Sequence, residues 1–176
     1  QFEDIKNCID GIEIELIGID TLSHDLALRY PYIAKDLLGI SIDTNQFFEV
    51  EDFIKLYDSS GINAPLSYKF LYRSQEVASI CESIEKNAVT FLFGPSGIGK
   101  TRLALEICRK YDKKMNVYCI RSNGNLLYED IKYYIDSPGE YLIYLDDANM
   151  VSSLENVVST LFSLGSEYKI KILISV

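Results

Sequence analysis

Beyond residue 66, short apolar runs alternate along the chain with amphipathic stretches. The apolar runs predict strands, and the stretches between them, whose apolar positions recur every three or four residues, predict helices. Because this alternation produces right-handed crossovers, it indicates an α/β fold in which a parallel sheet lies between two layers of helices. We expect strands at 89–93, 117–120, 141–145 and 170–176, and helices at 74–87, 101–111, 126–135 and 153–164.

The first 65 residues follow a different pattern. Residues 12–19 alternate apolar and acidic side chains, as a half-exposed strand does. The clearest break in the chain is the run at 59–65, which contains Ser, Gly, Asn and Pro. We therefore expect an α-rich tail or linker over residues 1–65 and an α/β unit over residues 66–176. Because the chain ends at the last expected strand, we expect a piece of a longer protein. The elements expected in the first unit are helices at 20–29, 31–38 and 50–57 and a connector at 41–46.

Charge is divided at the same place. The net charge of −9 arises within residues 1–65, which contain four basic and thirteen acidic side chains, whereas residues 66–176 contain thirteen of each. A segment this acidic does not attract nucleic acid through its net field. The hydrophobic content of 48% is that of a globular protein, and no apolar run approaches the length of a membrane span.

The sequence offers little for metal or disulfide chemistry of the usual kinds. It has a single histidine, His24, and four cysteines without a C-x-x-C pair, which is typical of buried thiols in a reducing cytoplasm. We therefore expect a cytoplasmic protein. The thirteen tyrosines fall mostly in expected strands and helices and predict packing in the core and at interfaces, for example at Tyr118, Tyr141 and Tyr144.

The segment after the first expected strand carries the strongest chemical signal. Its sequence, GPSGIGKT, matches the G-x-x-x-x-G-K-[ST] loop that binds phosphate groups. The glycines allow a tight turn whose N–H groups face inward, Lys100 can reach the β- and γ-phosphates, and Thr101 can bind Mg²⁺. The helix that follows presents its positive end to the phosphates. The residues expected to bind nucleotide here are Gly94, Pro95, Ser96, Gly97, Ile98, Gly99, Lys100, Thr101 and Arg102, with Lys100 also catalytic.

Two aspartates follow the third expected strand directly. A hydrophobic strand that ends in an acidic residue is the second element of phosphate-loop NTPases, because one carboxylate supports Mg²⁺ and the next polarises the attacking water. We assign Asp146 to the metal and Asp147 to water activation. The alternative is that the two aspartates cap the helix or loop that follows them.

Together, GPSGIGKT and YLIYLDDAN resemble the STAND class of signalling ATPases, which are relatives of AAA+ proteins and change state when they sense a partner. Members carry a hydrophobic-Gly-Arg-x-x-Glu box near the adenine, and residues 71–76 are similar, with Tyr72 in place of the glycine. The resemblance implies an adenine-binding role for Arg73, which could instead be a solvated residue at a helix start. It also implies a sensor role for Ser175 and the strand order 5-1-4-3-2.

Residues 12–47 resemble the end of a restriction-endonuclease-like (Mrr-type) effector, which precedes STAND ATPases in bacterial anti-phage proteins. The nuclease signature of that family is an Asp followed by Glu-x-Lys or Gln-x-Lys, and Glu13 and Glu15 lack the lysine. The resemblance therefore places the active site of the effector before Gln1, and the two glutamates fit a solvated strand face.

These resemblances imply an ATP- and Mg²⁺-dependent switch of a bacterial defence protein, without a membrane anchor. The nucleotide would stabilise a homo-oligomer once a phage protein is sensed, and the effector would then cleave DNA. Two alternatives stay open. A AAA+ or ORC-like motor ATPase would be favoured by a long charged insertion or pore loop after the second strand, and an oligomerisation scaffold would hold nucleotide without turnover. A GTPase is not indicated, because the chain has no N-K-x-D motif.

Overall fold

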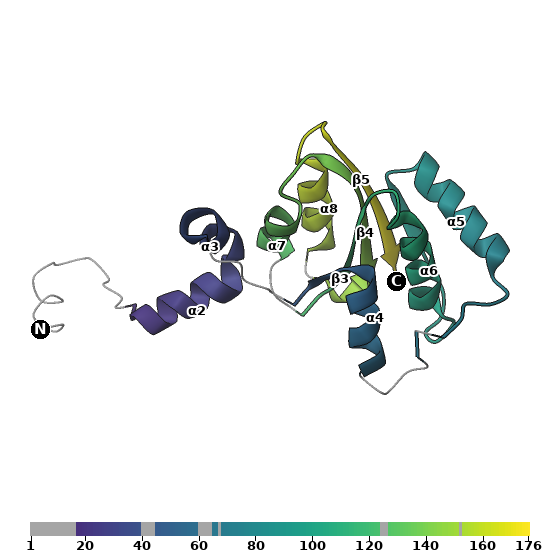
Figure 1. Ribbon diagram of the computed structural model, residues 1–176, viewed down its shortest axis with the longest axis horizontal. Coiled ribbons are helices and arrows are strands. Elements are labelled where there is room, and N and C mark those ends of the chain that lie inside the picture. The colour runs from purple at the N-terminus through teal and green to yellow at the C-terminus, as the bar shows by residue number, and fades with distance from the viewer. Residues whose placement is uncertain (1–16, 40–44, 60–64, 67, 124–126, 152) are drawn as a thin grey trace, which may run out of the picture.

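The computed structural model of the chain describes residues 17–39, 45–59, 65–66, 68–123, 127–151 and 153–176. The expected strand at 12–19 therefore lies mostly outside the described residues, and Glu13, Glu15 and Cys8 lie outside them entirely. The described chain folds into one five-stranded sheet with helices against it (Figure 1), which confirms the α/β class.

The sheet has the strand order β1-β3-β4-β5-β2. Its last four members are parallel, and β5 lies between β2 and β4, which confirms the expectation that the fourth strand of the α/β unit lies between its first and third. The first member, β1, pairs antiparallel with β3, so the sheet is mixed, and the expectation of a sheet that is parallel throughout was wrong. The strands are β1 Phe47–Phe48, β2 Val89–Leu92, β3 Asn116–Arg121, β4 Gly139–Asp146 and β5 Tyr168–Ser175.

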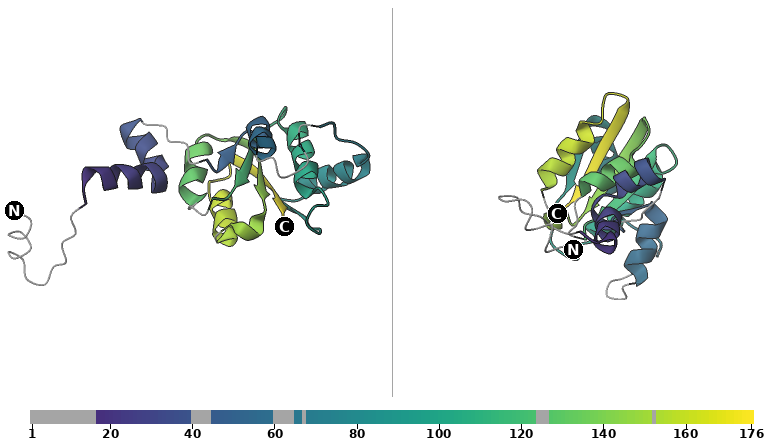
Figure 2. Two further views of the ribbon diagram at one scale, coloured as in Figure 1. Left: turned by 90° about the horizontal axis from the view of Figure 1, so that it is seen from below. Right: turned by 90° about the vertical axis from the view of Figure 1, so that its left-hand side faces the viewer.

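Helices pack against both faces of the sheet (Figures 1 and 2). Along β4, Leu142 and Tyr144 join the core that contains residues of α4, α5 and α6, whereas Ile143 and Leu145 join the core that contains residues of α7 and α8. A parallel strand buried on both sides accounts for its nearly continuous apolar sequence. The helices of this body are α4 Val50–Ser59, α5 Ser74–Lys86, α6 Lys100–Tyr111, α7 Leu127–Tyr134 and α8 Leu154–Phe162, with a short 3₁₀ helix at Ala148–Met150.

Every helix and strand expected after residue 66 is present, with ends that differ by at most two residues from those expected. The three helices expected before residue 65 are also present, with ends that differ by at most two residues, but one strand was missed. Phe47 and Phe48 form β1, whereas we had expected only a connector followed by a helix in this region. Two residues are too few to show the alternation that identifies a strand, so pairing with β3 decides this element.

Residues 46–59 share a core with the residues after 66. Phe53 of α4 is 1% exposed and lies in the same apolar cluster as Leu103 of α6. Gln46 is fully buried, and its side-chain amide donates a hydrogen bond to the Asp130 carboxylate of α7. The boundary expected at 59–65 therefore does not coincide with a gap in the packing.

Helices α2 (Ile19–Arg29) and α3 (Pro31–Leu38) extend from one end of this body (Figure 2). Gly39, with φ of 66°, ends α3 as expected. Lys35 joins α3 to α7, because its ammonium donates to the Tyr133 carbonyl (3.2 Å) and to the Asp136 carboxylate (2.7 Å). The hydrogen bond from Lys35 lowers the pKa of Asp136. None of the described helices is both long enough and apolar enough to cross a bilayer.

Candidate functional site

A cavity of about 290 Å³ lies at the edge of the sheet where the parallel strands have their carboxyl ends. Such edges collect ligands in open α/β folds, because the loops that leave the strands converge there. The cavity brings together residues that are distant in the sequence, including most of the candidate phosphate loop. Its lining residues are Tyr57, Leu66, Ser96, Gly97, Gly99, Lys100, Thr101, Arg102 and Asp147.

The loop between β2 and α6 has the backbone shape that its glycines allow. Gly97 and Gly99 have φ of 80° and 89°, in the left-handed region that side chains other than glycine rarely adopt. The first hydrogen bond of α6 runs from the Leu103 N–H to the Gly99 carbonyl at 3.0 Å. The N–H groups of the residues between them, at 100–102, precede the helical hydrogen-bond ladder. They are the donors that an anion at a helix N-terminus uses.

The Lys100 side chain folds back onto the loop that precedes it. Its ammonium donates to the carbonyls of Gly94 (2.8 Å) and Pro95 (3.3 Å). These are uncharged acceptors, so a phosphate in the cavity would be a stronger partner for the ammonium. The Lys100 ammonium is therefore held within the loop that is expected to bind the phosphate groups.

Asp146 is the centre of a buried cluster of hydroxyl groups. It is the last residue of β4 and is 3% exposed. Its Oδ1 accepts hydrogen bonds from Thr101 Oγ1 (3.0 Å), Ser175 Oγ (3.0 Å) and the Tyr144 hydroxyl. Burial raises the pKa of Asp146, and the hydrogen bonds from Tyr144, Ser175 and Thr101 oppose that rise. The structure thus joins the candidate metal ligands Thr101 and Asp146 directly. Hydroxyl and carboxylate oxygens are the ligands that Mg²⁺ prefers.

Tyr144 is a member of this cluster that the sequence analysis missed, because it assigned the residue to core packing. Its hydroxyl lies 3.1 Å from Ser175 Oγ as well as against Asp146. The available signal was the strand period, since residues two apart on β4 face the same side of the sheet. A tyrosine two positions before a candidate metal ligand can reach that ligand along the same face.

Ser175 and Asp147 meet at the carboxyl ends of β5 and β4. The backbone N–H of Asp147 donates to Ser175 Oγ at 3.2 Å. Asp147 has φ of 45° and an exposed side chain that lines the cavity, whereas Asp146 points into the protein. The two adjacent aspartates therefore have separate environments, as their separate roles require. The alternative that they cap the next helix is not favoured, because the 3₁₀ helix after Asp147 has no side-chain cap hydrogen bond.

Arg73 and Arg102 lie at the loop but bind backbone carbonyls. Arg73 Nη1 donates to the Ile98 carbonyl at 3.2 Å, and its Nε pairs with Glu76 at 3.1 Å. Arg102 lines the cavity while its guanidinium donates to the carbonyls of Pro65, Tyr68 and Lys69. Arg73 thus bonds the loop itself, and Arg102 bonds the segment at 65–69. A contact of either side chain with nucleotide stays a prediction.

Tyr72, at the position where the STAND box has glycine, has a left-handed backbone. Its φ of 67° is left-handed and its side chain is 98% exposed. A left-handed conformation costs a residue with a Cβ atom roughly 1–2 kcal/mol, and glycine adopts it without that cost. A glycine at this position would adopt the same backbone conformation without that strain.

We expect Tyr72→Gly to raise the free energy of unfolding by up to about 1 kcal/mol, because it removes this strain and no buried contact. Urea unfolding measures the change. Tyr68→Gly is the matched control, since Tyr68 is also exposed and its φ is not positive; it should lower the unfolding free energy, because glycine adds conformational freedom to the unfolded chain. Equal losses in the two variants would contradict the strain at residue 72.

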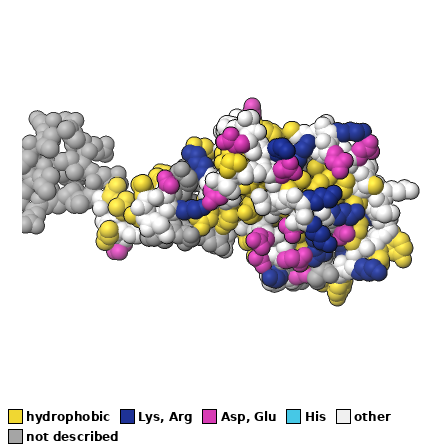
Figure 3. All heavy atoms as spheres, turned by 45° about the horizontal axis from the view of Figure 1, so that its top comes forward, with side chains coloured by type: hydrophobic (Ala, Val, Ile, Leu, Met, Phe, Trp, Pro, Cys, Tyr) yellow, Lys and Arg dark blue, Asp and Glu magenta, His cyan; other side chains and the backbone are white. Residues whose placement is uncertain are grey.

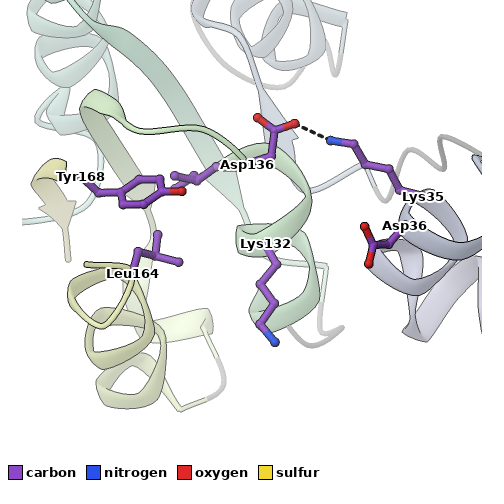
Figure 4. A pocket seen from close by; sticks show the side chains of 7 residues that line it. Lys35, Asp36, Lys132, Asp136, Leu164 and Tyr168 are labelled. Carbon is purple, nitrogen blue, oxygen red and sulfur yellow. Dashed lines mark hydrogen bonds and ion pairs between the residues drawn. The ribbon is translucent and has the colours of Figure 1, made fainter. Parts of the chain in front are cut away.

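A second cavity, of about 500 Å³, lies at the other end of the strands, beside the start of β5 (Figure 4). Two lysines and two aspartates are among its lining residues, so it offers no net positive charge to phosphate. The lining residues are Lys35, Asp36, Lys132, Ile135, Asp136, Leu164 and Tyr168.

No second candidate site is formed by the histidine and cysteines in the described part of the chain. On the face shown in Figure 3, basic and acidic side chains are interspersed. His24 is exposed on α2, and no group of three or more His, Cys, Asp and Glu side chains in the described residues could hold a metal ion. Cys108 and Cys119 are buried, as expected, whereas Cys81 is only partly buried. Comparison of the chain with protein-family models and with curated proteins found no match.

Proposed function

We propose that the chain is a P-loop NTPase that binds ATP with Mg²⁺ at the cavity beside the loop at 94–101. One observation carries this proposal: Thr101 of the loop and Asp146 of β4, 45 residues apart, are hydrogen-bonded at 3.0 Å beside a cavity that Lys100 and Asp147 also line. A chance match to the phosphate-loop sequence gives no reason for its threonine to hydrogen-bond the aspartate expected to support the metal.

The residues present fit the nucleotide and the metal. The left-handed glycines and the N–H groups at 100–102 form an anion-binding cradle, and the ammonium of Lys100 supplies a positive charge beside it. The oxygens of Thr101 and Asp146 match the ligand preference of Mg²⁺, which when bound supplies charge that stabilises phosphate oxygens. Asp147 lines the cavity and is the group that would orient water and accept its proton. Ser175 holds Asp146 and the Asp147 backbone together.

We further propose, on the resemblance to STAND ATPases, that nucleotide binding serves a signalling switch of anti-phage defence. ATP would favour a homo-oligomer, a phage protein would be the trigger, and DNA would be cut by an effector active site outside these 176 residues. The short connection between β3 and β4, which holds α7, supports the switch over a motor ATPase, because it leaves no room for a long pore loop.

Isothermal titration calorimetry of the chain with ATP and GTP, with Mg²⁺ and with EDTA, tests the proposal. We expect ATP to bind at millimolar concentration or below, more tightly with Mg²⁺ than without it and more tightly than GTP. Light scattering in the same solutions measures the oligomer. Absence of ATP binding at millimolar concentration would contradict the proposed function, and equal binding of GTP would contradict its base preference.

A further inference from the structure

Arg121 is the last residue of β3 and lies beside Asp146 in the sheet, because the two residues are Cα partners in the parallel pairing of β3 with β4. Side chains alternate between the faces of a strand, so each of these residues shares a face with the residue two positions before it. Those earlier residues, Cys119 and Tyr144, lie in the same apolar core cluster. Arg121 and Asp146 therefore extend from one face of the sheet, from strands about 4.8 Å apart.

The backbone of Arg121 is held on both sides, whereas its side chain is exposed. Its N–H donates to the Gln46 carbonyl at 3.0 Å, on the side away from β4. Its guanidinium lies 5.6 Å from the centre of the Tyr57 ring. Among the described residues, no carboxylate forms an ion pair with this guanidinium, although Asp146 is its neighbour in the sheet. The charge of Arg121 is therefore available to an anion.

Tyr57 connects this guanidinium with the proposed nucleotide cavity, because the tyrosine lines the cavity together with Asp147. Burial raises the pKa of Tyr57, the negative charges of Asp146 and Asp147 raise it further, and the positive charge of Arg121 opposes the rise. All three charges thus act on one side chain in the cavity wall. A guanidinium gains less from an aromatic ring than from phosphate oxygens, to which it can donate two parallel N–H groups. A phosphate within reach would therefore draw Arg121 away from the ring.

We propose that Arg121 binds the terminal phosphate of the nucleotide and thereby makes the site prefer a nucleoside triphosphate to a diphosphate. The inference rests on the proposed function, in which the loop after β2 holds the phosphate chain and Asp147, after β4, orients the water that attacks the terminal phosphate. In the sheet, β4 lies between β3 on one side and β5 and β2 on the other. A phosphate chain that runs from the loop toward Asp147 therefore points its free end toward Arg121.

The test is Arg121→Gln, which keeps a polar side chain and removes the charge. Calorimetry with Mg²⁺ gives the dissociation constants of ADP and of a non-hydrolysable ATP analogue. We expect the preference for the analogue over ADP to fall about tenfold or more, the size expected for a hydrogen bond to a charged group, while the affinity for ADP stays near the wild-type value. Arg121→Lys, which keeps the charge but not the paired donors, should lose part of the preference.

Arg29→Gln is the matched control, because Arg29 is an exposed arginine on α2, and this variant should behave as wild type. Thermal unfolding checks that each variant is folded. If the wild type binds both nucleotides and Arg121→Gln keeps the wild-type preference, or loses affinity for both nucleotides equally, Arg121 does not bind the terminal phosphate, and the proposed function stands without it. If the wild type binds neither nucleotide, the proposed function fails and the inference fails with it.

Discussion

Replacement of Lys100 by alanine is expected to weaken ATP binding at least 100-fold. The ammonium now bonds the Gly94 and Pro95 carbonyls, within the loop that would hold the phosphates. With ATP bound, we expect the ammonium to donate two hydrogen bonds to phosphate oxygens. Hydrogen bonds to charged groups contribute about 1.5–3 kcal/mol each, so the loss of both costs about 3 kcal/mol or more, which exceeds a factor of 100 in affinity. Calorimetric titration with ATP and Mg²⁺ measures the loss.

Lys110→Ala is the control for this variant, because Lys110 is an exposed lysine in the last turn of the same helix. It removes the same charge from α6 and should leave ATP binding unchanged. Tight ATP binding by a folded Lys100→Ala protein would show that the loop does not use its lysine, and would contradict the proposed site.

Asp146→Asn is expected to separate function from stability. Turnover of ATP should fall about 100-fold or more, and the gain in ATP affinity on adding Mg²⁺ should disappear, because an amide oxygen is a poor substitute for a carboxylate beside a divalent metal. The free energy of unfolding should stay the same or rise. Burial raises the pKa of Asp146, so the folded chain favours the protonated form and loses stability as pH rises from the unfolded pKa through the folded one. The asparagine carries no such charge at any pH.

The measurements are urea unfolding at neutral pH and Mg²⁺-dependent phosphate release. Asp112→Asn provides the control, since Asp112 is an exposed aspartate just after α6, and both quantities should stay near the wild-type values. A stable Asp146→Asn protein with undiminished Mg²⁺ dependence would remove Asp146 from the metal site. A large loss of stability would show that the ionised carboxylate supports the fold more than its burial costs.

The sequence by itself determined the elements after residue 66 and the motifs at their ends. The period of apolar positions identified β2 to β5 and α5 to α8 within two residues, because each of these elements buries a regular stripe. The phosphate loop and Asp146 could be found because each follows a buried strand directly. In a parallel sheet, residues that follow strands must meet at one edge, so their proximity follows from the topology.

Only the tertiary structure decided the contacts that surround these motifs. A strand period shows that Tyr144 and Asp146 share a face but not that Ser175 and Thr101 meet them there. The two residues of β1 are too few to show a strand period. Tyr57 lines the cavity, although it precedes the break at 59–65 that composition suggested as a boundary. Composition records local backbone preference, whereas the burial of Phe53 and Gln46 depends on surfaces formed by residues far along the chain. The tertiary structure therefore decided that α4 shares a core with the α/β unit and adds Tyr57 to its cavity.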